Sequence, residues 1–184
     1  MNVLSFLQVQ GCFREGHTAF KNGLHSGGWL EKGEIVRRPD LLQQLAQQQA
    51  QQIAQHWPET TLIVGAPACG AVLASFVGLE LGLPVAFAVT GQDIGWHRMH
   101  CPQAGQRAVY VDDLICTGRD ARRVLAFLRY EKHVALGVSA WLSHTPLAGE
   151  TLLTLTSAPF ENHPADHCPL CQQGQPLIFE GVRE

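Results

Sequence analysis

The stretch AVYVDDLICTGRD, residues 108–120, decides the fold. It begins with four largely apolar residues, which predict a short strand at 108–112 that is buried on both faces. Two adjacent carboxylates, Asp112 and Asp113, follow, and a short loop containing threonine and glycine leads into a helix expected at about 118–131. A buried strand that runs through a polar loop into a helix is the repeating unit of parallel sheets covered by helices.

The same alternation extends to both sides of this stretch. Pro39 suits the first position of a helix, Pro58 ends that helix, and Gly82 ends a second one. We expect the other helices at 39–57 and 70–81, and the other strands at 61–65, 84–89, 133–142 and 151–156. Apolar strands that alternate with helices predict an α/β fold with a mainly parallel sheet flanked by helices.

The length of 184 residues suits a single domain spanning 1–184. A short helix is expected at 2–10, and the glycines of 11–36 predict loops with a small hairpin. The chain therefore divides into an N-terminal helix and hairpin hood at 1–38, an α/β core at 39–156 and a tail with cysteines and histidines at 157–184.

Composition excludes several classes of function. Only 16% of residues are charged and the net charge is −3, which argues against a nucleic-acid binder that works through a basic face. The longest apolar runs are too short for a membrane helix, and the first ten residues lack the features of a signal peptide. We therefore expect a soluble cytoplasmic protein. The chain has three lysines, which are Lys21, Lys32 and Lys132.

The polar loop after the strand at 108–112 is the strongest candidate for a site. Ligands of such sheets bind beyond the carboxyl ends of the strands. Asp112 and Asp113 need water, a cation or hydroxyl donors there, and the amides of 116–119 could hold a phosphate at the helix start. The alternative is a plain connection, in which Thr117 and Asp120 form a capping box.

The stretch 109–120 resembles the phosphoribosyl pyrophosphate (PRPP) signature of type I phosphoribosyltransferases, and departs from it at Arg119 and Asp120, where glycine and a hydroxyl residue are usual. Residues 63–70, IVGAPACG, resemble the family's pyrophosphate loop. Residues 20–26, FKNGLHS, with Trp29 resemble a base-binding segment of orotate phosphoribosyltransferases, and CPLC at 168–171 resembles a tail of some bacterial members. The resemblance covers nearly the whole chain in order.

The resemblance implies a type I phosphoribosyltransferase fold and transfer of the phosphoribosyl group of PRPP to a nucleobase, with release of pyrophosphate, as in pyrimidine biosynthesis. It implies Mg²⁺ as cofactor and a homodimer, and it assigns catalytic roles to Asp112, Asp113 and Arg98 and base binding to Phe20 and Lys21. The PRPP-binding residues that it implies are Ala68, Cys69, Gly70, Asp112, Asp113, Cys116, Thr117, Gly118, Arg119 and Asp120.

Two departures concern activity. The loop at 90–107, where orotate enzymes carry lysines, has none here, and its cations are His97, Arg98, His100 and Arg107. His144 follows the strand at 133–142, where an arginine usually pairs with the carboxylate of orotate. The sequence therefore does not identify the nucleobase that the protein accepts. The alternative function is a catalytically impaired regulatory protein that still binds PRPP or a nucleotide.

The tail carries a group of nitrogen and sulfur donors. His163, His167, Cys168 and Cys171 are candidate ligands of a structural zinc, because C-x₂-C is half of a common zinc site. The direct adjacency of His167 and Cys168 makes a compact site from these four residues awkward, so that Cys12 or another histidine could complete it. The alternative is a set of reduced thiols.

Overall fold

The computed structural model describes residues 1–182, so the last two residues of the predicted tail, 183–184, lie outside the described residues. The larger of its sheets has the strand order β5-β4-β3-β6-β7-β8, and every neighbouring pair is parallel except β4 and β5. Its strands are β3 (Leu62–Gly65), β4 (Val85–Thr90), β5 (Ile94–Trp96), β6 (Arg107–Ile115), β7 (Val134–Ser143) and β8 (Leu152–Thr154). The predicted α/β fold is confirmed.

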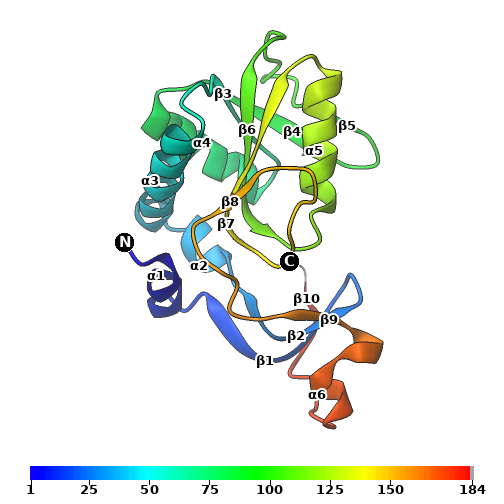
Figure 1. Cartoon of the computed structure of the whole chain (residues 1–184). Coiled ribbons are helices and arrows are strands. Elements are labelled where there is room, and N and C mark those ends of the chain that lie inside the picture. The colour runs from blue at the N-terminus through cyan, green and yellow to red at the C-terminus, as the bar shows by residue number, and fades with distance from the viewer. Residues whose placement is uncertain (183–184) are drawn as a thin grey trace.

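Helices cover both faces of this sheet, as Figure 1 shows. On one face α3 (Pro39–His56) and α4 (Cys69–Leu81) pack against Val109 and Val111, and on the other α5 (Arg119–Tyr130) packs against Val64 and Tyr110. Successive strand residues therefore enter different cores, which explains why the strands are apolar on both faces.

The order of the parallel strands creates a crevice at one edge of the sheet. The chain goes from β3 to β4 on one side of β3, and then returns to place β6 on the other side. The connections that leave β3 and β6 consequently diverge, and ligands of open α/β sheets bind at such a switch point, outside the carboxyl ends of the strands.

The strand β6 is longer than predicted. It continues to Ile115, so Asp112 and Asp113 lie within the strand and not beyond its end. The reason is the long neighbour β7, which still pairs with Asp112 and Leu114, whereas β3 on the other side stops where Gly65 pairs with Val111. The two acids therefore border the crevice that β3 leaves open.

The hood and the tail form a second sheet together. The hood contains α1 (Val3–Val9), β1 (Phe13–Phe20), β2 (Leu24–Leu30) and α2 (Gly33–Val36), and the tail contains β9 (Asn162–Pro164), the 3-10 helix η1 (Ala165–His167), α6 (Pro169–Gln172) and β10 (Phe179–Val182). The strand order is β10-β1-β2-β9, so the two tail strands flank the hood hairpin (Figure 1). Among residues 1–182, no helix is long and apolar enough to cross a membrane.

Candidate functional site

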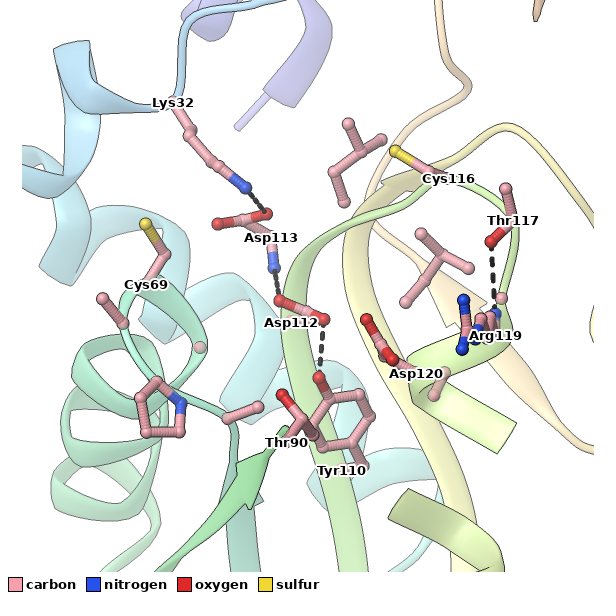
Figure 2. Close-up of a pocket in the computed structure, with 18 residues that line it drawn as sticks. Lys32, Cys69, Thr90, Tyr110, Asp112, Asp113, Cys116, Thr117, Arg119 and Asp120 are labelled. Atoms are coloured by element: carbon pink, nitrogen blue, oxygen red, sulfur yellow. Dashed lines mark hydrogen bonds and ion pairs between the residues drawn. The ribbon is translucent and has the colours of Figure 1, made fainter. Parts of the chain in front are cut away.

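A cavity of about 640 Å³ lies at the carboxyl ends of β3, β4 and β6. Two segments form most of its wall, which are 66–70 after β3 and 112–121 at the end of β6 and the start of α5. Lys32, Thr90 and Tyr110 complete the lining (Figure 2). The structure thus brings all ten predicted PRPP-binding residues, from Ala68 to Asp120, to one cavity at the switch point of the sheet.

Asp112 is held by two donors. The hydroxyl of Tyr110 donates to Oδ2 at 2.6 Å, and the amide of Asp113 donates to Oδ1 at 3.0 Å (Figure 2). Burial and the neighbouring charge of Asp113 nevertheless raise the pKa of Asp112 to about 7, against an ordinary value of 3.8. Its carboxyl group is therefore partly protonated near neutral pH, and a cation or hydroxyl donors in the cavity would favour the charged form.

Asp113 is bound from the hood. Lys32, which lies between β2 and α2, donates from Nζ to Oδ1 of Asp113 at 3.0 Å, and the Asp113 side chain is only 2% exposed. Burial opposes the charge of Lys32, but the carboxylate of Asp113 raises the pKa of Lys32 above its usual value. The other oxygen of Asp113, Oδ2, is buried with no hydrogen-bond partner among the described residues.

The turn at 116–120 forms the start of α5. Gly118 adopts a left-handed conformation with φ of 69°, and a Cβ there would lie 2.3 Å from Cδ2 of Leu147. The guanidinium of Arg122 donates to the carbonyl of Thr117 at 2.8 Å, which holds the turn from the helix side. The start of a twelve-residue helix suits an anion such as a phosphate.

Arg119 and Asp120 occupy the two positions that depart from the family's signature. The amide of Arg119 donates to the hydroxyl of Thr117 at 3.4 Å. The Asp120 side chain is 63% exposed and forms an ion pair with Arg123 at 3.4 Å. Arg123 thus offsets part of the negative charge that Asp120 brings to the turn at 116–120.

The segment at 66–70 approaches Asp112 from the other wall of the cavity. A Cβ on Gly70 would lie 3.3 Å from Oδ1 of Asp112, so a side chain there would crowd the carboxylate. Burial and the charge of Asp113 raise the pKa of the neighbouring Cys69 thiol. Cys69 therefore stays protonated at neutral pH, which suits a wall of the cavity and not a nucleophile.

Three predicted site residues do not line this cavity. Phe20 is buried at the end of β1, and Lys21 is exposed on the turn that follows. Arg98 lies in a turn after β5, beside the edge of the sheet. Their roles stay predictions.

Polar residues that line the cavity but were not predicted as site residues include Lys32, Thr90 and Tyr110. Lys32 supplies the cation at Asp113 and is one of three lysines in the chain.

The segment at 90–107 is folded along the sheet in this structure. The amide of His97 donates to the carbonyl of Phe87 at 2.8 Å, and the ring of His100 stacks on Phe87 with centroids 4.0 Å apart. A small cavity beside His100 is lined by Pro84 and Val85, at the opposite end of β4 from Thr90. The histidines of this segment therefore lie away from the two acids.

His144 lies at the end of β7, as predicted from its place after that strand. It lines a second cavity of about 670 Å³ with Ser143, Asn162 and His163. The amide of His144 donates to the carbonyl of Ile115 at 2.9 Å, and Ile115 also lines the cavity with the two acids. A residue that lines the second cavity is thus hydrogen-bonded to one that lines the first.

The predicted metal ligands of the tail need correction. Cys168 and Cys171 lie close together, but the histidines beside them are His17 and His25 of the hood, and not His163 and His167. His167 is 76% exposed in its side chain and contacts Asp166, because it belongs to the 3-10 turn that precedes α6.

Comparisons with known proteins agree with this fold. No protein-family model matches the chain. An orotate phosphoribosyltransferase of Caldicellulosiruptor bescii is 27% identical over 198 residues, which cover 100% of both chains. The solved orotate phosphoribosyltransferase of Aeropyrum pernix has a TM-score of 0.71 at 16% identity and covers 85% of this chain and 93% of its own. The adenine phosphoribosyltransferase of Rhodothermus marinus has a TM-score of 0.65 at 17% identity, over 85% of this chain and 98% of its own.

The two solved structures show the fold, since this chain resembles both over 85% of its length although their names state different bases. The relative from Caldicellulosiruptor bescii is similar to this chain along its whole length, and it is named as an orotate phosphoribosyltransferase. The chain therefore has the fold of type I phosphoribosyltransferases and is similar along its whole length to proteins named as orotate phosphoribosyltransferases.

Proposed function

We propose that this protein is a phosphoribosyltransferase that transfers the phosphoribosyl group of PRPP to a nucleobase and releases pyrophosphate. The observation that carries the proposal is the single cavity in which the acids Asp112 and Asp113 face both the loop at 66–70 and the turn at 116–120. PRPP carries a ribose between a 5′-phosphate and a pyrophosphate, and the cavity offers groups suited to each part.

The chain would act mainly by positioning PRPP. The amides of the turn at 116–120 bind the 5′-phosphate, and the loop at 66–70 lies along the pyrophosphate. Between them, Asp112 and Asp113 accept hydrogen bonds from the ribose hydroxyls. Because the reaction displaces one group at a ribose carbon by a ring nitrogen of the base, correct orientation of the two reactants supplies much of the rate enhancement.

The acids also fit the Mg²⁺ that the family implies. Magnesium prefers oxygen ligands and is usually held by one or two carboxylates together with substrate phosphates. Asp113 offers such an oxygen, since its Oδ2 is buried without a hydrogen-bond partner in the described part of the chain. Asp112 and Asp113 are the residues that would hold the ion or its water shell. The chemistry that Mg²⁺ supplies when bound is neutralisation of charge on the leaving pyrophosphate.

The cation nearest to the two acids comes from the hood. Lys32 reaches the cavity from the segment before α2, and Arg119 lines the opposite wall. These two side chains compensate in part for the absence of lysine from the segment at 90–107. A role for Arg98 in charge stabilisation remains a proposal, which requires this segment to leave the edge of the sheet during the reaction.

A catalytically impaired regulatory protein is not favoured, because the whole-length likeness is to proteins named as enzymes. The first experiment is titration calorimetry with Mg-PRPP on the intact chain. We expect binding that Asp113→Asn weakens strongly, with Arg107→Ala, at an exposed ion pair outside the cavity, as the matched control. Absence of binding at millimolar PRPP would contradict the proposal.

The base is proposed to be orotate. The likeness to orotate enzymes supports this proposal. We expect the affinity for orotate to be low, because His144 cannot form the bidentate pair that an arginine forms with a carboxylate. Pyrophosphate release should be measured with orotate, uracil, adenine and hypoxanthine in parallel. Orotate should give the highest kcat/KM, and His144→Arg should lower the KM for orotate. A higher kcat/KM for a purine base would reassign the substrate.

A homodimer is also proposed, as the resemblance implies. Val72 and Leu79 are 41% and 70% exposed, and their spacing of seven places both on one side of α4, where a partner could cover them. Sedimentation equilibrium should give twice the chain mass of 20.2 kDa, and a mass that stays at 20.2 kDa at micromolar concentration would exclude the dimer.

A further inference from the structure

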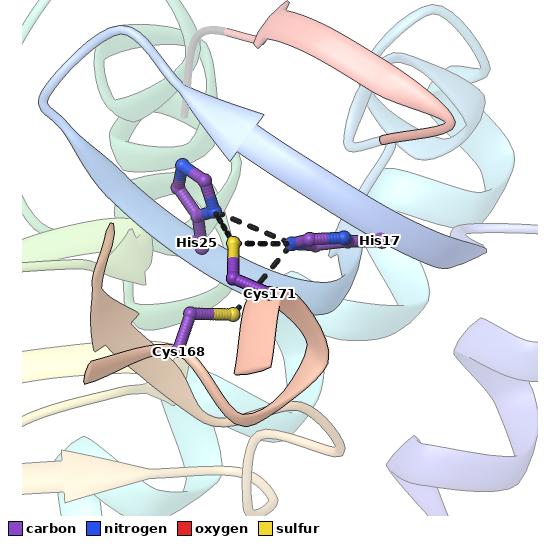
Figure 3. A group of neighbouring side chains, drawn as sticks. All are labelled: His17, His25, Cys168 and Cys171. Atoms are coloured by element: carbon purple, nitrogen blue, oxygen red, sulfur yellow. Dashed lines mark hydrogen bonds between the residues drawn. The ribbon is translucent and has the colours of Figure 1, made fainter. Parts of the chain in front are cut away.

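Four potential metal ligands from the two ends of the chain meet beside the hood hairpin (Figure 3). They are His17 on β1, His25 on β2, and Cys168 and Cys171 at the start of α6. One ligand atom from each residue lies within 4.8 Å of the other three. The hood histidines and the tail cysteines, which are 143 or more positions apart in the chain, therefore form one cluster. Neither segment could supply all four ligands alone.

Local structure explains the convergence. His25 pairs with Ala19 across the hairpin, and its ring centroid lies 5.3 Å from that of His17, which belongs to an irregular part of β1 between Glu15 and Thr18. Cys168 caps α6 and Cys171 follows three residues later, so both sulfurs lie on one side of the first helical turn. The segment between β9 and β10 carries that turn across the face of the hairpin on which the histidines lie (Figure 3).

Four of the six distances between the ligand atoms are close to the edges of a tetrahedral metal site, and all six are within 4.8 Å. Zinc bonds of about 2.3 Å to sulfur and about 2.0–2.1 Å to nitrogen give tetrahedral edges of about 3.3–3.4 Å between two nitrogens and about 3.5–3.6 Å between nitrogen and sulfur. Nε2 of His17 lies 3.3 Å from Nδ1 of His25, 3.6 Å from Sγ of Cys168 and 3.5 Å from Sγ of Cys171. Nδ1 of His25 lies 3.3 Å from Sγ of Cys171.

The tautomer of His17 is suited to a metal. Its Nδ1 lies 2.8 Å from the carbonyl of Gln175, which can only accept, so Nδ1 carries the proton and Nε2 presents a lone pair to the cluster. Such a hydrogen bond to a backbone carbonyl commonly orients a metal-bound histidine. Two thiols and the second imidazole face this one lone pair, which can accept only one good hydrogen bond. A cation at the centre satisfies all four groups together.

We propose that His17, His25, Cys168 and Cys171 bind one structural Zn²⁺ that fastens the C-terminal tail to the hood. Two thiolates with two imidazoles in a tetrahedron are a donor set that favours zinc, and four protein ligands leave no open position, as in structural sites. Cys168 and His17 are buried while Cys171 is exposed, so the site has a protected side and an entry path.

The site lies apart from the cavity with the two acids. His25 is near the start of β2, whereas Lys32 comes after the end of the same strand. The tail is already joined to the hairpin by pairing of β10 with β1 and of β9 with β2, and the amide of Ile178 donates to the carbonyl of His17 at 2.8 Å. Zinc would fix the segment between these two strands, which includes α6, against the same hairpin.

The test begins with untagged protein that is purified without chelator and analysed for metal by mass spectrometry. We expect one zinc per chain, and reconstitution with Co²⁺ should give the visible absorption of a tetrahedral site with thiolate ligands. Cys171→Ser should weaken Zn²⁺ binding by about 100-fold or more, since it removes one of four ligands. Because Cys171 is exposed, this variant is expected to fold, and circular dichroism checks that it does.

Matched controls separate this site from other donors. Cys101→Ser removes another exposed thiol, and the double variant His163→Ala with His167→Ala removes the tail histidines outside the cluster. All controls should keep one zinc per chain. Removing zinc with a chelator should lower the Tm of the wild type and leave that of Cys171→Ser unchanged. The proposal is overturned if the wild type binds no Zn²⁺ at micromolar concentration, or if the histidine double variant loses the metal.

Discussion

Nζ of Lys32 lies 3.0 Å from Oδ1 of Asp113, and this ion pair joins the hood to the central strand of the α/β core. Lys32 is 29% exposed in its side chain and Asp113 only 2%. The pair places the hood cation Lys32 against an acid that we assign to PRPP binding. Hood position, core stability and ligand binding are therefore expected to depend on the same contact.

Replacement of Lys32 by methionine should destabilise the protein. The variant leaves the Asp113 carboxylate buried without a cation. Removing one partner of a fully buried pair costs about 3–5 kcal/mol, and the partial exposure of Lys32 reduces the expected loss to about 2–3 kcal/mol. Urea unfolding measures this change in the free energy of unfolding.

The exposed pair of Arg107 and Glu59 provides the control. Both side chains are more than 40% exposed, so Arg107→Ala should cost less than about 1 kcal/mol. Adding Asp113→Asn to Lys32→Met should recover part of the lost stability, because the uncompensated charge is removed. Equal costs for Lys32→Met and Arg107→Ala would show that the buried pair is not formed.

Asp112→Asn should have an effect on stability that depends on pH. The pKa of Asp112 is about 7 in the folded chain, above its ordinary value, so the folded state binds more protons than the unfolded state between about pH 4 and 7. The carboxyl group therefore favours the folded state less as pH rises through this range. Asparagine stays neutral, so the Tm of the variant minus that of the wild type should increase from about pH 5 to about pH 8.

Thermal unfolding in matched buffers gives this difference directly. PRPP binding by the wild type should strengthen over the same pH range, because Asp112 becomes fully charged, whereas the variant should lack that dependence. A Tm difference that stays constant with pH would mean that Asp112 does not titrate near neutrality.

Gly118→Ala should damage the turn at 116–120, for which we propose phosphate binding, with Gly82→Ala as its control. Both glycines have left-handed backbones, with φ of 69° and 64°, so each substitution costs about 1–2 kcal/mol in backbone strain. A Cβ at Gly82 meets nothing within 4 Å, whereas at Gly118 it would lie 2.3 Å from Leu147. Gly118→Ala should therefore cost more stability, and it alone should weaken PRPP binding in calorimetry. Similar losses of PRPP affinity in both variants would argue against the turn as the phosphate site.

The core of the fold could be predicted from the sequence, because its strands are continuous apolar runs and each of its helices has a proline or a glycine at one end. The prediction of a helix from Pro39 and of one ending at Gly82 is confirmed. The strands β5, β9 and β10 were not predicted. They have three or four residues each, which leaves little local pattern in the sequence. The strands β9 and β10 pair with distant strands of the hood, and β5 pairs with the adjoining β4 at the edge of the sheet.

The site could be predicted only where its residues are consecutive. The turn at 116–120 and the loop at 66–70 each have a local pattern, and both line the cavity. Lys32 reaches Asp113 across 81 positions, and His17 reaches Cys168 across 151. Such contacts depend on how the hood docks on the core and on how the tail crosses the hairpin, which hydrophobic periodicity does not encode. The pairing of the tail cysteines with His163 and His167 was wrong for the same reason.

The most direct test of the central claim is the rate of pyrophosphate release from Mg-PRPP by the purified protein, with orotate and without any base. The account predicts release that requires a base, is fastest with orotate, and is lost in Asp113→Asn. Binding of PRPP without pyrophosphate release for any nucleobase would contradict the assigned activity and support a regulatory protein with the same pocket.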